Sequence, residues 1–558
     1  MTVDKRELSY AVGWGVVVML ATCIPHLIMW WYLPLDGVYP WVLQNSDDHG
    51  VYYAWLKQGR DGAVFFRNMF TTEPQSGAYF HFYYLVLGWV SRLTGLDVPT
   101  TNQLGRLVFG VVTLVLSYRL AALFTADQFT RRCCFWTVAL SSGVGWVVWT
   151  NHPRQWEPVD VWQPEAITFS SLYSNGLFAV SLSLMLGVIL FLLLAERRGW
   201  PWAIGAGLCG LVLGNIHSYD VIHLTLAWGL YLLARWRSTG QVPTRELGHA
   251  LLAAAVASPS VAHMAWLYKT EPVFRQRADA ATWSRGLWLY LFGFGLVVPL
   301  AAWGFRRYWQ GSGAGERARG LLLPAWIFGA LIAAYLPLAF QRKMIMGIHV
   351  PLAILAGFAV AELARRAAAR LGGGGGERRQ GVLAGVAAAG IIAVLSPSSV
   401  LYPVRDVQVA LQEQVTSTGI HPVYWQDSFV RSLEWIGENT PRTAGVLTAP
   451  FYGVFAPTWS GRAVFAGHWA ETPRFGPKLD PAFEFYWGTA GSEQREQFLR
   501  ENRITHVVES RYEREFAEAL AEKQRPLSPQ RPLASEPFLA EVYRTGTGAA
   551  EAVVYEVR

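Results

Sequence analysis

Long apolar segments alternate with short basic loops through most of the chain. Many of these segments contain about twenty residues, the length that crosses roughly 30 Å of hydrocarbon as a helix. The pattern therefore predicts about eleven membrane-spanning helices. Their approximate bounds are 10–33, 104–124, 133–150, 174–195, 200–216, 220–236, 247–268, 286–304, 320–339, 347–364 and 381–401.

The arginines between these segments predict the orientation of the chain in the membrane. If the N-terminus is cytoplasmic, the basic loops at 131–132, 196–198, 235–237, 306–319 and 365–379 all fall on the inside, where basic loops are favoured. The aromatic segment 78–95 is apolar enough to be another span, but counting it would place every later basic loop outside. We therefore predict that it is a helix lying at the outer interface. The expected protein is a multi-pass protein of the cell (inner) membrane, with its C-terminus outside.

From about residue 403 the pattern changes to short alternating strands and helices. Helices are predicted at 428–438 and 493–502, with strands at 445–448, 463–466 and 504–508 and a hairpin at 538–558. This alternation is typical of a small α/β layer.

The fold-class prediction is thus a mainly α, polytopic bundle followed by a small α/β domain. The membrane domain would be 1–402, including the first outer loop 34–103, and the extracytoplasmic domain would be 403–558. The C-terminal domain shows no phosphate loop or nucleophile elbow, which favours a structural or acceptor-docking role.

Composition supports the membrane assignment. Of the 558 residues, 52% are hydrophobic and only 16% are charged, whereas soluble domains carry about 25% charged residues. The net charge of +7 does not indicate nucleic acid, because the arginines are confined to short loops instead of forming a phosphate-binding stripe. The four cysteines all lie in or beside apolar segments, so we predict neither a disulfide framework nor a zinc site.

Two adjacent carboxylates, Asp47 and Asp48, follow the first predicted span. Ionisable side chains at a membrane face are costly to keep dry, and they are functional candidates for that reason. One of them could be the N-cap of the helix that follows, for which Asp is a preferred residue. The other would then remain available as a base or metal ligand. His81, later in the same loop, is a weaker substrate-binding candidate.

The second outer loop carries Glu165 among hydroxyl and aromatic side chains that include Tyr173. Aromatic rings that stack on a sugar, together with polar groups that hydrogen-bond it, suit a carbohydrate site. Alternatively, Glu165 only interacts with a helix N-terminus.

Two further pairs fall on the predicted outer side. His217 and Asp220 are three residues apart and would share a helix face, either as ligands or as the capped end of a helix. Arg342 and Lys343 stand at the outer edge of a span, against the general bias of basic residues to the inside. They suit a phosphate group, or they extend toward lipid headgroups without a specific ligand.

Together these features resemble the GT-C superfamily of integral-membrane glycosyltransferases, which includes protein O-mannosyltransferases and aminoarabinose transferases. The resemblance rests on an acidic pair in the first outer loop, an aromatic juxtamembrane helix, an Arg opening the next span, a basic stretch before a later span and a motif in the tail. These are Asp47-Asp48, Tyr79 to Trp89, Arg106, Phe340 to Lys343 with Gly347 and Pro351, and Gly467 to Thr472.

The resemblance implies transfer of a sugar, with inversion, from a polyprenyl-phosphate-linked donor in the bilayer to a glycan, lipid or protein acceptor docked from outside. Asp48, or else Asp47, would be the base or a metal ligand. Glu165 would position the acceptor, or share with Asp48 a divalent metal such as Mg²⁺ or Mn²⁺. Many members carry a second Asp in the second outer loop, where this chain has Glu165 unless Asp160 serves.

In this assignment Arg342 and Lys343 would neutralise the departing phosphate, where developing negative charge benefits most from nearby cations. Two other classes stay open. A flippase or transporter of lipid-linked sugars would use the cations without a base, but it would also tend to show paired, Gly/Pro-broken spans. A non-catalytic membrane scaffold would tolerate replacement of Asp48.

Overall fold

The computed structural model describes residues 4–148, 157–372, 376–417, 421–487, 490–521 and 532–558, which form two compact units. The helical unit comprises Met1–Ile24, Leu104–Met264 and Ala281–Arg405. The mixed unit comprises Pro25–Gln103, Ala265–Ala280 and Asp406–Arg558. By compactness, therefore, most of the first predicted outer loop groups with the C-terminal residues, although the sequence analysis grouped it with the membrane bundle.

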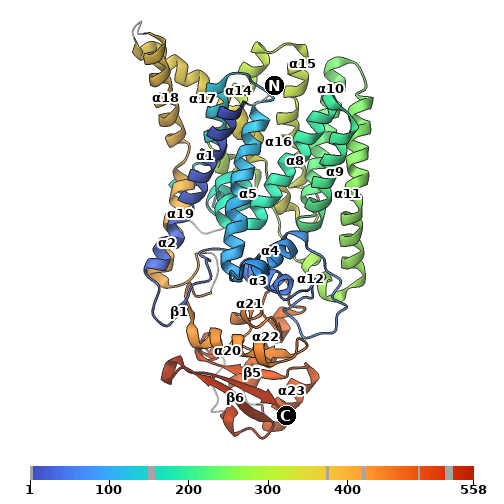
Figure 1. Cartoon of the computed structure of the whole chain (residues 1–558), viewed down its shortest axis with the longest axis vertical. Helices are drawn as coiled ribbons and strands as arrows, with labels where there is room; N and C mark the ends of the chain where they lie inside the picture. The colour runs from blue at the N-terminus through green and yellow to red at the C-terminus, as the bar shows by residue number, and fades with distance from the viewer. Residues whose placement is uncertain (1–3, 149–156, 373–375, 418–420, 488–489, 522–531) are drawn as a thin grey trace. The chain divides into compact units, whose positions relative to one another are not determined.

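The helical unit is built from long helices that lie alongside one another (Figure 1). Its helices are α1 (Lys5–Ala21), α6 (Gln128–Leu140), α7 (Thr168–Ser174), α8 (Gly176–Arg198), α9 (Trp200–Ile216), α10 (Asp220–Thr239), α13 (Leu287–Phe294), α14 (Val297–Gly311), α15 (Ala314–Gly320), α16 (Leu322–Ala333), α17 (His349–Gly372) and α18 (Glu377–Val394). It also holds most of α5 (Val98–Ala121), α11 (Thr244–Thr270) and α19 (Pro397–Glu413). Short 3₁₀ turns connect them: η1 (Gly145–Val147), η3 (Val159–Val161), η4 (Pro164–Ala166) and η5 (Gln341–Ile345).

The apolar helices confirm a polytopic, mainly helical protein. By length and composition, 5 helices of the described chain could cross a membrane, or up to 7 if each of two bent helix pairs is one span. The predicted number of about eleven spans stays a prediction. Segment 78–95 contains α4 (Phe82–Thr94), whose 13 residues rise only about 20 Å, too short to cross the bilayer.

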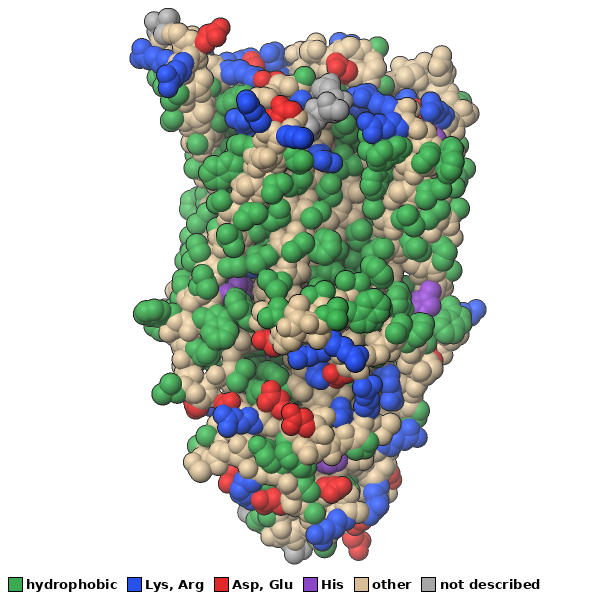
Figure 2. Space-filling view, viewed as in Figure 1, with side chains coloured by type: hydrophobic (Ala, Val, Ile, Leu, Met, Phe, Trp, Pro, Cys, Tyr) green, Lys and Arg blue, Asp and Glu red, His purple; other side chains and the backbone are tan. Residues whose placement is uncertain are grey.

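Side-chain types are segregated along the helical unit (Figure 2). Hydrophobic side chains cover its flank, whereas Lys and Arg gather at the end where Figure 1 labels α15, α17, α18 and the N-terminus. This is the end that the arginine pattern assigns to the cytoplasm.

Glycines let several helices of this unit approach backbone to backbone, as in many membrane bundles. A Cβ on Gly304 of α14 would come 1.8 Å from the carbonyl oxygen of Leu355 in α17. A Cβ on Gly357 would come 2.5 Å from the Cα of Cys134 in α6, and one on Gly329 of α16 would meet Ala227 of α10. Two of these contacts involve α17, so its buried position depends on residues without side chains.

The mixed unit combines residues from the first outer loop with the C-terminal region. Its helices are α2 (Ile24–Trp31), α3 (Ser46–Arg60), α4, α12 (Pro272–Asp279), α20 (Asp427–Asn439), α21 (Ala456–Ser460), α22 (Phe475–Trp487), α23 (Ser492–Glu501) and α24 (Arg511–Ala521). Its strands are β1 (Gly37–Val38), β2 (Trp425–Gln426), β3 (Gly445–Leu447), β4 (Ala463–Val464), β5 (His506–Glu509), β6 (Leu539–Thr545) and β7 (Ala552–Val557). Short 3₁₀ turns complete it: η6 (Tyr452–Val454), η7 (Leu533–Ser535) and η8 (Gly548–Ala550).

A five-stranded sheet of order β4-β3-β5-β7-β6 forms the centre of the C-terminal part. Strands β4, β3 and β5 are parallel, with Val446 opposite both Val464 and His506. In the final hairpin, β7 pairs antiparallel with β5, and β6 pairs antiparallel with β7. This confirms the predicted α/β layer. A second, two-stranded pair joins the early and late parts of the chain, because Gly37 of β1 lies opposite Gln426 of β2.

We predict that Gly304→Ala destabilises the helical unit. The added methyl group would overlap the Leu355 carbonyl, and overpacking of this kind typically costs about 1–3 kcal/mol. The melting temperature of purified protein should therefore fall. Gly311→Ala is the matched control, because a Cβ at that end of α14 meets nothing within 4 Å. Equal melting temperatures for the two variants would contradict the predicted close contact.

Candidate functional site

Helix α3 presents both first-loop carboxylates in its first turn, where the helix dipole favours negative charge. The residue before the helix, Asn45, adopts a left-handed conformation with φ 52° and is the N-cap. Neither Asp47 nor Asp48 is therefore the N-cap, contrary to that alternative from the sequence. The Asn45 amide instead donates a hydrogen bond of 2.9 Å to Asp48 Oδ2. The Asp47 and Asp48 side chains are 35% and 44% exposed.

The position of α3 is set by a close contact with the C-terminal part of the mixed unit. A Cβ on Gly50 would lie 2.5 Å from the Val454 carbonyl oxygen, so the helix and η6 approach backbone to backbone. Helix α21 also packs against α3. Around this contact α3 is buried along most of its length, including Trp55 and Leu56. The contact brings side chains from the C-terminal region to the start of α3.

His421 is the first of these side chains. Its Nε2 lies 2.8 Å from the Phe451 carbonyl oxygen, which can only accept, so Nε2 carries the proton. Its Nδ1 then accepts from the Ser46 hydroxyl at 2.8 Å and lies 3.3 Å from Asp47 Oδ1. Burial lowers the pKa of His421, although the nearby Asp47 charge opposes the shift. A neutral ring thus presents a lone pair to Asp47.

His468, from the Gly467–Thr472 turn, has the opposite arrangement. Its Nδ1 accepts from two backbone groups, the N–H of Ala470 at 3.0 Å and that of Glu471 at 3.2 Å. The ring proton must therefore sit on Nε2, which lies 3.7 Å from Asp48 Oδ1. Nε2 is buried and has no hydrogen-bond partner within the described part of the chain.

Neither histidine was singled out as a site residue from the sequence, because both lie far along the chain from Asp48. The only sequence signal was the resemblance of Gly467 to Thr472 to a motif of other proteins. His81, which the sequence did select, is fully buried as the N-cap of α4, with its ring 5.2 Å from that of Trp55 and 4.6 Å from that of Tyr84. This environment suits a structural cap.

In the helical unit, the two candidate cations Arg342 and Lys343 each lie over an aromatic ring. The Arg342 guanidinium lies 5.1 Å from the centre of the Trp162 ring, and the Lys343 ammonium lies 5.7 Å from that of Tyr219. Gln163 donates to the Arg342 carbonyl oxygen at 3.2 Å. Across the described ranges no carboxylate lies within ion-pair distance of Arg342.

His217 and Asp220 form a buried pair at the start of α10. His217 Nδ1 lies 2.6 Å from Asp220 Oδ2, and the Tyr219 hydroxyl lies 2.5 Å from His217 Nε2. Both ring nitrogens thus have partners, which favours the helix-end alternative over ligation. The Tyr219 ring links this pair to Lys343 through the contact described above.

Glu165 lies in η4, which packs against the η5 turn that carries Arg342 and Lys343. The structure thus brings these three predicted residues to neighbouring turns. Tyr173 is buried in α7, with its ring stacked on Phe169 at 6.3 Å, so its face is not open for sugar stacking. Its substrate-binding role stays a prediction.

Asp160 is a buried carboxyl group in η3, near Glu165 in sequence. Its Oδ2 accepts a 3.0 Å hydrogen bond from the Gly145 backbone N–H. Burial raises the pKa of Asp160 to about 7, and bonds from Ser398 and Gly145 offset this only in part. Through the hydrogen bond with Gly145, Asp160 connects its own turn, η3, to the turn η1.

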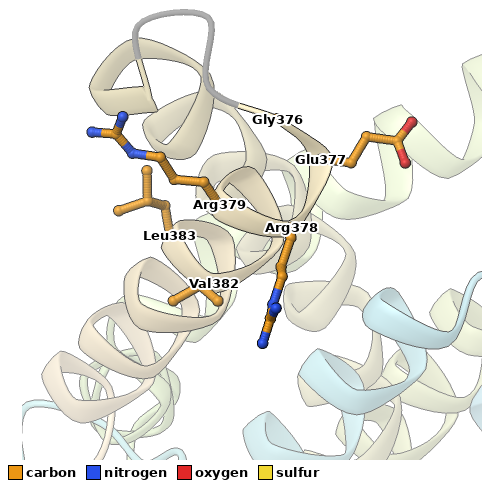
Figure 3. Close-up of a pocket in the computed structure, with 6 residues that line it drawn as sticks. All are labelled: Gly376, Glu377, Arg378, Arg379, Val382 and Leu383. Carbon is orange, nitrogen blue, oxygen red and sulfur yellow. The ribbon is translucent and has the colours of Figure 1, made fainter.

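Metal ligation was predicted for Asp48 and Glu165. These residues belong to different units, and the described residues include no group of three or more His, Cys, Asp and Glu side chains that could hold a metal ion. A hollow at the start of α18 is lined by Gly376, Glu377, Arg378, Arg379, Val382 and Leu383 (Figure 3). It contains none of the candidate site residues.

No protein-family model and no curated protein matches the sequence. Several solved membrane glycosyltransferases match the structure. The apo oligosaccharyltransferase of Archaeoglobus fulgidus has a TM-score of 0.53 at 13% identity, over 91% of this chain and 70% of that chain. ArnT from Cupriavidus metallidurans bound to undecaprenyl phosphate has a TM-score of 0.51 at 14% identity, over 99% of this chain and 98% of that chain.

Arabinofuranosyltransferase AftD from Mycobacteria is a third similar structure. Its TM-score is 0.52 at 13% identity, over 100% of this chain but only 40% of that chain. At such low identity the likeness establishes the fold alone. The chain therefore has the GT-C fold of these polytopic proteins, as the sequence resemblance implied.

We predict that Asp160→Asn changes how stability depends on pH. In the unfolded chain Asp160 loses its proton near pH 4, but in the folded protein it does so near pH 7. Stability contributed by the protonated group is thus lost between these values, at up to about 1.4 kcal/mol per pH unit. As pH rises from about 4 to about 7, the variant should therefore gain stability relative to wild type, as measured by thermal unfolding. Parallel pH profiles would contradict this.

Proposed function

We propose that the chain is a glycosyltransferase that moves a sugar from a polyprenyl-phosphate-linked donor to an acceptor at the outer face of the cell membrane, with inversion. The observation that carries this proposal is Asp48, a half-exposed carboxylate held at the start of a buried helix beside a buried imidazole. The fold supports it, because the similar structures are membrane glycosyltransferases. ArnT is bound to undecaprenyl phosphate in one similar structure, and an archaeal oligosaccharyltransferase is in complex with a dolichol-phosphate in another.

The chemistry assigned to Asp48 is that of a general base. The acceptor hydroxyl oxygen attacks the anomeric carbon while Asp48 takes its proton, and the bond from that carbon to the phosphate oxygen breaks. One displacement from the face opposite the leaving group inverts the anomeric carbon. Proton transfer to a positioned carboxylate typically accelerates a reaction about 10²- to 10⁴-fold. Asp47 is the second choice for this role, because its neighbour His421 presents a lone pair to it.

The departing polyprenyl phosphate carries negative charge, and we assign Arg342 and Lys343 to bind it. Arg offers several donors in a planar fork that matches phosphate oxygens, and Lys adds a compact charge. Both cations lie against aromatic rings. Glu165, on the turn packed against them, is assigned to the acceptor.

A divalent metal remains an expectation from the resemblance, and one similar oligosaccharyltransferase structure is a complex with Zn and sulfate. The donor set of the described residues does not fit a metal by itself, since it offers no group of three ligands. No step above depends on one. The acceptor class, whether glycan, lipid or protein, is likewise open; one similar structure holds a peptide containing an NVT sequon.

Asp48→Asn should abolish sugar transfer, with a loss of at least about 100-fold, while leaving the protein folded in the membrane. The assay supplies purified protein with labelled polyprenyl-phosphate sugars and a cell-envelope fraction as acceptor, and it measures labelled product and released polyprenyl phosphate. Asp427→Asn is a matched control, because Asp427 also lies in the first turn of a helix of the mixed unit but pairs with Arg431 at its surface. Full activity of Asp48→Asn would remove Asp48 as the base. Donor binding without transfer by wild type would favour a transporter.

Arg342→Ala should weaken use of the lipid-phosphate donor more than use of the acceptor. Loss of a charged hydrogen bond of about 1.5–3 kcal/mol corresponds to a rise in donor KM of roughly 10- to 100-fold. Arg366→Ala is the control, because Arg366 also covers a Trp ring, that of Trp303, but lies about 25 Å along α17 from the start of that helix at His349. An unchanged donor KM for Arg342→Ala would leave Arg342 as a residue that only extends toward lipid headgroups.

A further inference from the structure

We propose that His468 is a positioning residue for Asp48, which makes the C-terminal domain part of the catalytic machinery. This inference rests on the proposed function and extends it. In the sequence analysis the C-terminal domain was expected to be a structural or acceptor-docking part. The geometry around His468 instead assigns the C-terminal domain a direct effect on Asp48, the reacting carboxylate.

Two backbone N–H groups fix the tautomer of His468. The backbone N–H groups of Ala470 and Glu471 both point at Nδ1 of His468, and an N–H can only donate. Nδ1 therefore carries a lone pair and Nε2 carries the hydrogen. The turn from Gly467 to Thr472 is closed by two further bonds, since the Thr472 hydroxyl lies 3.0 Å from the Gly467 backbone nitrogen and 2.9 Å from the Phe70 carbonyl oxygen. The ring orientation is thus set by the fold of the turn.

The Nε2–H group of His468 lies close to Asp48. The His468 side chain is only 4% exposed, and its Nε2 lies 3.7 Å from Asp48 Oδ1. This buried nitrogen has no hydrogen-bond partner among the described residues. A buried N–H without a partner is costly, so a closer approach of Nε2 to the Asp48 carboxylate is energetically favoured.

The two Asp48 oxygens lie near different neighbours. The Asn45 amide donates to Oδ2 at 2.9 Å, and His468 faces Oδ1. A separation of 3.7 Å exceeds hydrogen-bond distance, but such contacts in catalytic sites commonly shorten when substrate binds. With both oxygens oriented, one lone pair of the carboxylate is directed to the acceptor hydroxyl. An error of about 1 Å at such a group can cost roughly 100-fold in rate.

His421 cannot serve in the same way. Its proton is held by the Phe451 carbonyl oxygen, so its Nδ1 offers Asp47 a lone pair instead of a donor. The imidazoles beside the two carboxylates therefore differ, because the ring near Asp48 carries its N–H on that side and the ring near Asp47 does not. This difference is independent support for Asp48 over Asp47 as the base.

Two substitutions separate positioning from folding. In His468→Asn the side-chain oxygen stands where Nδ1 was, so it can still accept from Ala470 and Glu471, but the donor toward Asp48 is gone. In His468→Gln the amide nitrogen reaches the place of Nε2 and can restore that donor. The control is His506→Asn, the same change at a buried histidine of β5 that the proposal does not involve.

We expect His468→Asn to lower kcat about 10- to 100-fold, with donor KM changed less than about twofold and the melting temperature close to wild type. His468→Gln should recover a large part of the loss, and His506→Asn should keep wild-type kcat. The assay uses the full chain with labelled undecaprenyl-phosphate sugars and a cell-envelope fraction as acceptor.

The result that would overturn the inference is wild-type kcat in a folded His468→Asn protein. Equal losses in both His468 variants that follow a drop in melting temperature would also overturn it, because they would indicate a structural role only. Failure of the proposed function is distinguishable from either outcome, since wild type itself would then transfer no sugar from any donor.

Discussion

The arrangement of the mixed unit depends on one contact between backbones, that of α3 with η6 at Gly50 and Val454. A side chain at position 50 would hold the helix away from the C-terminal part, because its first carbon would overlap a carbonyl oxygen. With glycine there, α3 packs closely enough that Ser46 reaches His421 and Asp48 lies beside His468. The short β1–β2 pair reinforces the same join between distant parts of the chain. The carboxylates are consequently exposed at one end of a helix that is otherwise buried.

In the helical unit, the two candidate cations contact aromatic rings. The Arg342 guanidinium lies over the ring of Trp162, and the Lys343 ammonium lies over that of Tyr219. A ring face attracts a cation without neutralising it, whereas a carboxylate partner would cancel most of its field. His217 and Asp220 differ from these cations, because their polar side chains are hydrogen-bonded to each other inside the fold. The placement of Arg342, which has no ion-pair partner among the described residues, is thus compatible with its proposed role as a phosphate ligand.

The sequence was informative wherever the signal is local. Apolar segments and the alternating elements after residue 403 follow from periodicity, and the structure has β3, β5 and the final hairpin where they were predicted. It also has a short helix, α4, within segment 78–95, whose interfacial position stays a prediction. Asp47 and Asp48 stood out because two adjacent charges after an apolar span are rare. His421 and His468 could not be found in this way, because their relation to α3 arises only from tertiary contacts. The alternative that Asp47 or Asp48 is an N-cap was wrong for a local reason: Asn45 takes that position in a left-handed conformation, which Asn tolerates better than most residues.

The contact between α3 and the C-terminal domain also determines when, during synthesis, the carboxylates and imidazoles can meet. Ser46 and its partner His421 are separated by 375 residues of chain. At a synthesis rate of about 5–20 residues per second, the carboxylates leave the ribosome roughly 20–75 s before the imidazoles that face them. During that interval the nascent protein can insert its apolar helices while its carboxylates still lack these neighbours. The Asp and His pairs can therefore form only after His421 and His468 have been synthesised, and a chain that ends before His421 lacks both imidazoles.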